Sequence, residues 1–380
     1  MKSKKSKEEE LTMDERNVKE FLESTWEELH KIPEPGDKTP KTCAWLAERL
    51  QEFGYDVDSD VGGGVLGLLD SGKPGPHLAL RSDTDALEFY VNGEKVPYHG
   101  CCHDGHMSIV LAAAKTLAEE GIQKGKLYIV FQPGEEPNLG AKAMIETGKL
   151  QDIQEMVGLH LCPDADTPHG KVAPLMMHNG LGMLNAVFTG KNSHGSLPQN
   201  GINAAEAAVL AVNAANTIRC APDKSWSCKV TQISADRSSD NTIPDYARVA
   251  FDLRAENNEI LESLTEKLKN ALTCAAQAVG AGVSFDYVMD PAPSYDSDLA
   301  KTVEEAITAV LGADRCIGPC PTGGGEDFHF YSYLLGAKTA YMSVGAHVNP
   351  ALHIYENTFD HEMLYAAYQI LCAIAHKKLG

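Results

Sequence analysis

The segment HGCCHDGH, residues 99–106, brings three histidines, two adjacent cysteines and an aspartate together. Cys101 and His103 are two positions apart, so their side chains can point the same way in an extended segment or a tight turn. A thiolate and an imidazole that converge in this way are suitable ligands for zinc or a related divalent metal. The same pair could instead be a nucleophile with its base, and the adjacent cysteines could simply pack in a core. The segment alone leaves these alternatives open.

Two adjacent carboxylates, Glu135 and Glu136, follow the apolar run KLYIVFQ and the dipeptide Pro133-Gly134. Adjacent side chains on a non-helical backbone diverge, so one carboxylate could bind a metal while the other faces a bound water. This division favours metal-assisted hydrolysis, with one glutamate as ligand and the other as general base. The alternative is a solvated acidic turn.

Two further histidines lie where an α/β sheet would place a site. His160 comes at the end of the apolar run EMVGLHL, and His353 lies in a loop near the C-terminus. Open α/β sheets bind ligands at the carboxyl ends of their strands, and this shared position favours a common site. Asp85, just after the run HLALRSD, is expected to orient a ligand histidine, with turn capping as the alternative. Asp104 is expected to have the same orienting role.

The elements that would position these residues alternate between strands and helices up to about residue 180. Strand-like runs begin after the glycine turn 62–64, at His77, at Lys126 and at Glu155, and a helix is clearest over residues 107–120. This alternation predicts an α/β layer with a mainly parallel sheet flanked by helices. A separate helix is expected from Thr39, as its N-cap, to Gly54.

The pattern changes from about residue 184 to a β-α-β-β-α-β order, which is typical of a ferredoxin-like α+β domain. We therefore expect a discontinuous catalytic, metal-binding domain over residues 1–180 and 292–380. An inserted domain is expected over residues 181–291. The last helix, strand and helix of the chain would return to the first domain.

Composition excludes several classes of protein. The chain has 380 residues, 43% of them hydrophobic, and a formal net charge of -20. Without a basic stripe, nucleic acid is not an expected partner. No run of about 18 apolar residues is present, so no membrane span is expected. The opening MKSKKSKEEE does not have the pattern of a secretory signal, and ten cysteines without an export signal favour the cytoplasm.

Eight segments together resemble the aminoacylase and carboxypeptidase superfamily of co-catalytic metallopeptidases. The segments are LRSDTDAL, HGCCHDGH, FQPGEEPNLGAKAMIETG, GLHL, GKNSHGSLPQNGINAAEAA, NTIPDYARVAFDLR, GGGEDF and LHIYENTFD. They occur in family order and extend from about Leu29 to the end. The resemblance is to the branch of N-acyl-amino-acid amidohydrolases that includes hippurate hydrolases and indoleacetyl-amino-acid hydrolases.

This resemblance implies a role for each matching residue. A pair of divalent metals would be held by Cys101, His103, Glu136, His160 and His353, with Glu135 as general base. The inserted domain would be a lid and dimerisation domain, implying a homodimer or higher homo-oligomer. Its His194 would polarise the scissile carbonyl or stabilise the oxyanion, in its own or a partner's active site. Asn241 and Arg254 would bind substrate, Arg254 by gripping a carboxylate.

Several departures from the branch surround the expected pocket. Cys102 stands where glycine is usual, Glu88 replaces a common proline, and the segment after His353 is atypical. A thiolate ligand favours zinc, cobalt or nickel over magnesium, and the resemblance keeps manganese open. A small N-acyl amino acid is the expected substrate. The alternatives are a dipeptidase, an aromatic-amine aminohydrolase, a cysteine-nucleophile amidase and a catalytically idle binding protein.

Overall fold

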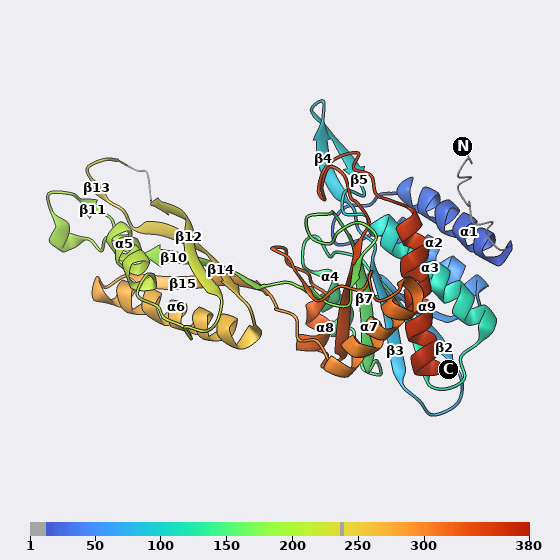
Figure 1. Ribbon diagram of the computed structural model, residues 1–380. Helices are drawn as coiled ribbons and strands as arrows, with labels where there is room; N and C mark the ends of the chain where they lie inside the picture. The colour runs from blue at the N-terminus through green and yellow to red at the C-terminus, as the bar shows by residue number, and fades with distance from the viewer. Residues whose placement is uncertain (1–12, 236–238) are drawn as a thin grey trace, which may run out of the picture. The chain divides into compact units, whose positions relative to one another are not determined.

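The computed structural model describes residues 13–235 and 239–380, which form two compact units (Figure 1). Unit 1 comprises the described residues of Met1–Met177, Tyr295–Pro321 and Phe330–Gly380, and unit 2 those of His178–Ser294 and Thr322–His329. The short segment Thr322–His329 belongs to unit 2, although the sequence suggested a single insertion that ends at residue 291.

A seven-stranded sheet forms the centre of unit 1. Its order is β1 (Asp56–Val61), β2 (Gly64–Asp70), β6 (Lys126–Gln132), β3 (His77–Asp83), β7 (Glu155–Cys162), β17 (Lys338–Gly345) and β8 (Val172–Ala173). The four strands β6, β3, β7 and β17 run parallel, whereas β1, β2 and β8 join by antiparallel pairing. The expected mainly parallel α/β sheet is therefore confirmed.

Helices cover this sheet. They are α1 (Met13–His30), α2 (Pro40–Glu52), α3 (His103–Glu120), α4 (Gly140–Glu146), α7 (Ser297–Leu311), α8 (His329–Tyr333) and α9 (Glu362–Leu379). Helix α3 packs between β3 and the helices α1 and α9, and most of its residues are buried (Figure 1). This burial fixes the start of α3, which carries the HGCCHDGH segment, against the edge where β3, β6 and β7 end.

Helix α3 begins at His103, four residues before the start expected from periodicity. Its N-cap, Cys102, has φ +64°, in the left-handed region that favours glycine. A residue in this region costs about 1 kcal/mol, which gives a physical reason for glycine being usual here in the family. The left-handed turn lets Cys101 precede the helix while His103 occupies its first position.

Helix α2 has the expected boundaries, but a different side chain bonds to the N–H groups of its first turn. Thr39 is its N-cap, yet its hydroxyl makes no capping bond and lies 2.7 Å from Thr84 Oγ1. The Glu34 carboxylate instead accepts the backbone N–H groups of Lys41 and Thr42, each at 2.9 Å. A carboxylate at this end also interacts favourably with the helix dipole.

A β-hairpin that was not expected projects from unit 1 (Figure 1). It consists of β4 (Leu87–Val91) and β5 (Glu94–Tyr98), joined by the residues Asn92 and Gly93. Both linking residues have positive φ, as a two-residue hairpin turn requires. The hairpin leads directly into the segment with Cys101. Unit 1 also contains the short parallel pair β9 (Met176–Met177) and β16 (Cys320–Pro321).

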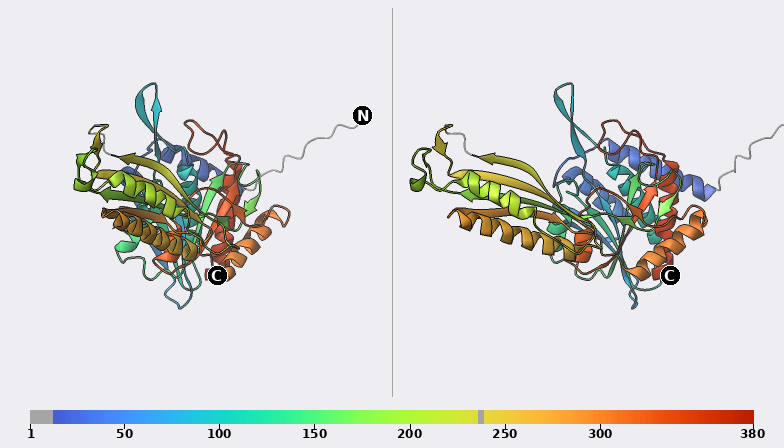
Figure 2. Two further views of the ribbon diagram at one scale, coloured as in Figure 1. Left: turned by 90° about the vertical axis from the view of Figure 1, so that its left-hand side faces the viewer. Right: turned by 60° about the vertical axis from the view of Figure 1, so that its left-hand side comes forward.

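Unit 2 has the expected ferredoxin-like order. Its elements are β10 (Gly180–Thr189), α5 (Ala204–Ala215), β12 (Trp226–Ala235), β14 (Tyr246–Ala255), α6 (Asn258–Ala278) and β15 (Gly282–Asp290). The antiparallel sheet has the order β12-β14-β10-β15, and α5 and α6 pack on one face of it (Figure 2). Unit 2 also contains a short antiparallel pair outside this sheet, formed by β11 (Ser193–His194) and β13 (Thr242–Ile243). A 3-10 turn, Pro198–Asn200, follows β11.

Among the described residues, no helix combines the length and the apolar character that crossing a bilayer requires.

Candidate metal centre

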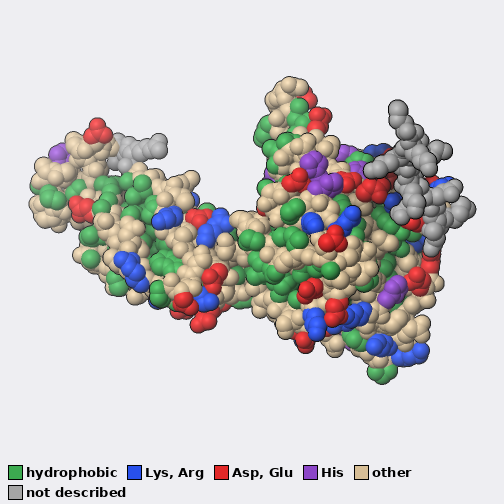
Figure 3. Space-filling view, viewed as in Figure 1, with side chains coloured by type: hydrophobic (Ala, Val, Ile, Leu, Met, Phe, Trp, Pro, Cys, Tyr) green, Lys and Arg blue, Asp and Glu red, His purple; other side chains and the backbone are tan. Residues whose placement is uncertain are grey.

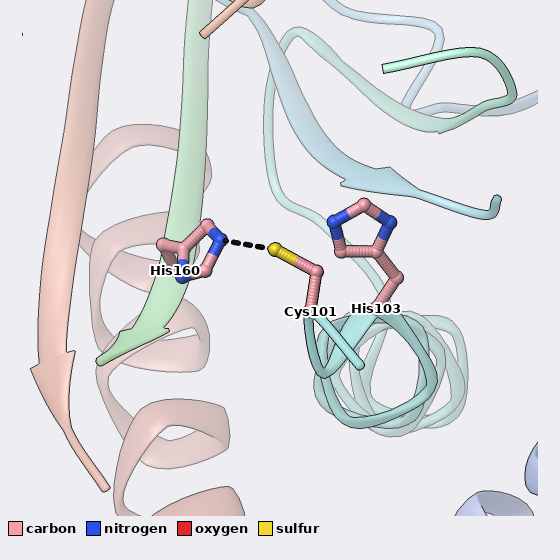
Figure 4. Close-up of side chains that lie close together, drawn as sticks. All are labelled: Cys101, His103 and His160. Atoms are coloured by element: carbon pink, nitrogen blue, oxygen red, sulfur yellow. Dashed lines mark hydrogen bonds between the residues drawn. The ribbon is translucent and has the colours of Figure 1, made fainter. Parts of the chain in front are cut away.

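Three donor side chains converge at the start of α3. The Cys101 thiol precedes the helix, His103 begins it, and His160 extends from β7 (Figure 4). One possible ligand atom from each of these residues lies within 4.8 Å of the others, and Cys101 Sγ is 3.5 Å from His160 Nε2. All three residues are buried. Sulfur and imidazole nitrogen donors at this spacing could hold one divalent metal.

A second donor group shares the same thiol. Cys101 Sγ lies 3.3 Å from His353 Nε2, and that nitrogen lies 3.4 Å from Glu136 Oε1. His103, Glu135 and Glu136 form a third group in which possible ligand atoms lie within 4.8 Å of one another. Cys101 therefore belongs to both possible metal positions. Glu135 lies close to one donor of each position, His103 and Glu136.

Backbone carbonyls orient two of the histidine rings. His103 Nδ1 donates to the carbonyl of Asp85 at 2.8 Å, and His160 Nδ1 donates to the carbonyl of Leu161 at 2.8 Å. Both rings can then present Nε2 as a neutral donor, as metal ligation requires. His103 Nε2 and Glu136 Oε1 are buried and make no hydrogen bond. Because buried polar atoms rarely lack a hydrogen-bond partner, both atoms fit a bound cation; Glu136 Oε1 otherwise has only the His353 imidazole, at 3.4 Å.

His106 lies near this cluster without being a suitable ligand. Its Nδ1 donates to Asp83 Oδ1 at 2.8 Å, and its Nε2 accepts the backbone N–H of Leu161 at 2.9 Å. Both ring nitrogens are thus engaged. Asp83 also pairs with the buried Arg81, whose Nη1 lies 2.8 Å from Asp83 Oδ2. This network supports β3 and α3 beneath the donors.

The electrostatics of the donor cluster favour a cation. Burial alone would lower the pKa of His103, but Asp83, Asp85 and Glu136 outweigh it and raise that pKa to about 10. Burial raises the pKa of the Cys101 thiol well above its ordinary value, and Glu136 and Glu135 raise it further. A divalent cation would offset these carboxylates and favour the thiolate. Histidine and acidic side chains also gather on the surface beneath the β4–β5 hairpin (Figure 3).

The two expected orienting aspartates differ. Asp85 contacts the cluster in two ways, because its carbonyl accepts from His103 and its Oδ2 accepts the backbone N–H of Glu136 at 3.0 Å. Asp104 instead lies 2.6 Å from His30 Nδ1, and its other oxygen accepts the N–H of Gly105 at 2.9 Å. Asp104 therefore secures α3 to α1, and no hydrogen bond joins it to a candidate ligand among the described residues.

The candidate catalytic residue His194 and the candidate substrate-binding residues Asn241 and Arg254 lie in unit 2. The side chains of His194 and Asn241 are neighbours, with Asn241 Nδ2 at 3.4 Å from His194 Nε2. His194 Nδ1 lies 2.7 Å from the hydroxyl of Ser196. Arg254, on β14, pairs with Asp252 at 3.1 Å and does not contact that pair. The described structure thus joins two of the three residues, on an exposed surface.

Sequence reasoning missed two residues around the centre. His30 lies outside the motifs that predict the site, yet it is the partner of the buried Asp104. Asn357 was not considered, although its side chain bonds to Gly100, immediately before Cys101. The only signal for Asn357 was that the segment after His353 departs from the family pattern.

A mainly parallel sheet with thiol, imidazole and carboxylate donors at its carboxyl edge is typical of metal-dependent hydrolases. Residues 79–377 match the peptidase family M20/M25/M40, and the chain belongs to that family.

Relatives agree with this assignment, and a solved structure shares the fold. The chain is 30% identical over 323 residues to the IAA-amino acid hydrolase ILR1-like 2 of Arabidopsis thaliana, covering 80% of this chain and 72% of that protein. It is 29% identical over 372 residues to the hippurate hydrolase of Campylobacter jejuni, covering 93% and 95% of the two chains. Its fold resembles a crystal structure from methicillin-resistant Staphylococcus aureus with a TM-score of 0.87 and 24% identity, covering 96% and 98% of the two chains.

Proposed function

We propose that the protein hydrolyses the amide bond of N-acyl amino acids with the help of two divalent metals, which Cys101 and the donors around it would hold. The observation that carries this proposal is the pair of donor groups that share the Cys101 thiol, with Glu135 beside them. One position would use His103 and His160, and the other Glu136 and His353. Zinc or manganese is the expected metal, with cobalt or nickel as further candidates because sulfur and nitrogen donors favour them.

The proposed mechanism assigns a proton transfer to Glu135. When bound, the metals would supply polarisation of the substrate carbonyl and acidification of a water. The Glu135 carboxylate would take a proton from the attacking water and deliver it to the leaving nitrogen as the C–N bond breaks. The acyl group gains the hydroxyl, and the amino acid leaves as a free amine. Glu136 would serve as a metal ligand and not as the base, because the hydrogen bond from its backbone N–H to Asp85 holds it in place beside the other donors.

Unit 2 is proposed to act as the lid. His194 would stabilise the negative charge that develops on the carbonyl oxygen, and Asn241 would hold the ring of His194. Arg254 would bind the carboxylate of the amino acid. Its existing bond to Asp252 leaves other guanidinium N–H groups for this role.

The proposed substrate class follows the relatives. Their names indicate action on indoleacetyl-amino acids, on hippurate and, for a Bacillus subtilis protein 28% identical to this chain, on N-acetyl-L-cysteine. All three are amino acids with an acyl group on nitrogen. We therefore infer that this chain accepts a compound with a free carboxylate beside a secondary amide.

Assembly and location are also proposed. The edge strand β12 exposes Val230 and Ile233, and α5 exposes Val209 and Leu210. An unpaired strand edge and apolar side chains on one domain favour a homodimer through unit 2. All ten cysteines are free thiols, which fits a reducing compartment such as the cytoplasm.

A metal-reconstitution screen tests the proposed function. Protein stripped with a chelator is expected to be inactive, and added zinc, manganese or cobalt is expected to restore hydrolysis. N-acetyl, N-benzoyl and N-indoleacetyl amino acids should be cleaved faster than dipeptides or aromatic amines. Activity that survives chelation but not thiol alkylation would instead support a cysteine nucleophile. A preference for dipeptides would replace the substrate assignment while leaving the metal centre intact.

A further inference from the structure

The loop that carries His353 lies between β17 and α9 and is closed on itself. Asn349 and Thr358 exchange two backbone hydrogen bonds, at 2.8 and 2.9 Å. The loop packs against the β4–β5 hairpin, where the rings of Tyr355 and Phe89 are 5.9 Å apart (Figure 1). A candidate ligand therefore lies on a loop rather than on a strand or helix.

His353 is held differently from the other candidate ligand histidines. Its side chain is 57% exposed, and its φ of +60° lies in the left-handed region. This backbone conformation costs about 1 kcal/mol and must be maintained by the surroundings. In residues 13–235 and 239–380, no hydrogen bond reaches His353 Nδ1, whereas His103 and His160 each donate from that atom to a carbonyl. The position of His353 therefore depends on how its backbone is held.

A single carbonyl holds that backbone. Gly100 O, in the residue before Cys101, accepts the backbone N–H of His353 at 2.8 Å. The same oxygen accepts Nδ2 of Asn357 at 2.8 Å. Gly100 permits this close approach because a Cβ there would lie 2.6 Å from Phe89 Cζ and 3.3 Å from the carbonyl oxygen of Ile354.

The buried side chain of Asn357 connects the loop to the Gly100 carbonyl. It is only 5% exposed, and its Nδ2 also donates to the carbonyl of Ala351 at 3.1 Å. The Tyr98 hydroxyl donates to the Asn357 carbonyl at 2.9 Å. The side-chain amide of Asn357 thus joins the start of the loop to the turn of Cys101, and its backbone carbonyl joins the loop to the hairpin. Such interactions around a ligand typically change metal affinity by about 10- to 100-fold.

We propose that Asn357 is a positioning residue that sets metal affinity at the position formed by Cys101, Glu136 and His353. The position formed by Cys101, His103 and His160 should depend on Asn357 far less, because backbone carbonyls outside the loop orient both of its histidine rings. This inference rests on the proposed function, since it requires two metal positions. It assigns to the atypical segment after His353 the task of fixing that histidine.

Metal titration of the apoprotein tests this role without measuring turnover. Wild-type protein should bind two cobalt ions, with thiolate-to-cobalt absorption from Cys101. The Asn357→Ala variant should keep one tight site and bind the second ion about 10- to 100-fold more weakly. Asn357→Asp keeps the size of the side chain but loses both N–H donors, so it should weaken the second site as Asn357→Ala does. Retention of one tight site shows that either variant is folded.

A double-mutant cycle identifies the residue through which Asn357 acts. His353→Ala should weaken the same site, and adding Asn357→Ala to it should cause little further loss. Tyr98→Phe, which removes only the bond to the Asn357 carbonyl, is the matched control and should have a smaller effect. Two sites of wild-type affinity in Asn357→Ala, or equal losses at both sites, would overturn the inference alone. A wild-type protein that binds no metal would overturn it together with the proposed function.

Discussion

The candidate metal ligands of unit 1 and the candidate catalytic histidine of unit 2, His194, are held in different ways. His103 and His160 are buried, and each ring is fixed by a bond to a backbone carbonyl. His194 is exposed and is held by side chains of Ser196 and Asn241. A buried, oriented donor needs little reorganisation to bind a metal, whereas an exposed side chain can adjust to a substrate. Metal binding and proton transfer are therefore expected to reside in unit 1, and contacts to the substrate and its developing oxyanion in unit 2.

The largest expected effect comes from Glu135 in unit 1. Glu135→Gln should lower kcat by about 10²- to 10⁴-fold, because the amide cannot take the proton of the attacking water. Metal content measured by elemental analysis should remain unchanged. Near-normal turnover in this variant would show that the proton is transferred elsewhere.

Removing the side chain of His194 tests unit 2. His194→Ala should lower kcat by about 10²- to 10³-fold, as expected for loss of one donor to the oxyanion. Metal affinity should stay at the wild-type value, because His194 belongs to none of the donor groups of unit 1. Asn241→Ala serves as the control and should reduce activity less, since it acts on His194. Loss of metal from His194→Ala would contradict the assignment of metal binding to unit 1 alone.

Metal affinity should rise with pH. The raised pKa of His103, about 10, means that its ring carries a second proton, on Nε2, in the metal-free protein near neutrality. Metal binding must expel that proton, so each unit decrease in pH should weaken binding by about tenfold for each proton released. Calorimetry in buffers of different ionisation enthalpy measures the proton release. Affinity that does not change with pH would contradict the assignment of His103 as a ligand.

The smallest effect is expected at Cys102, which the metal groups do not use. Cys102→Gly relieves about 1 kcal/mol of left-handed strain, but glycine loses about as much in chain entropy on folding. The free energy of unfolding should therefore change by less than about 1 kcal/mol, as measured by denaturant titration, with metal content retained. Cys102→Val is the matched control and should be clearly destabilising because a branched side chain tolerates this backbone poorly. If Cys102→Gly loses metal, the thiol takes part in the centre.

Much of the fold could be predicted from local patterns. The β-α-β-β-α-β order of unit 2 and the mainly parallel sheet of unit 1 follow from hydrophobic periodicity and turn residues. The β4–β5 hairpin was not predicted, although Asn92-Gly93 is a strong hairpin signal, because each strand has only five residues and β5 contains Pro97, which is unfavourable in a strand. The start of α3 was misplaced because a left-handed Cys102 has no signature in composition.

The sequence by itself determined which side chains could act. Cysteine, histidine and glutamate at the ends of apolar runs specify a donor set, because side-chain chemistry and strand ends are local properties. Only the tertiary structure decided how the donors are aimed. The backbone carbonyls of Asp85, Leu161 and Gly100 fix the candidate ligand histidines. Because every residue has a backbone carbonyl, the amino-acid sequence does not show which carbonyls have this role. The pairing of Asp104 with His30, 74 positions apart, likewise exists only once α1 packs on α3.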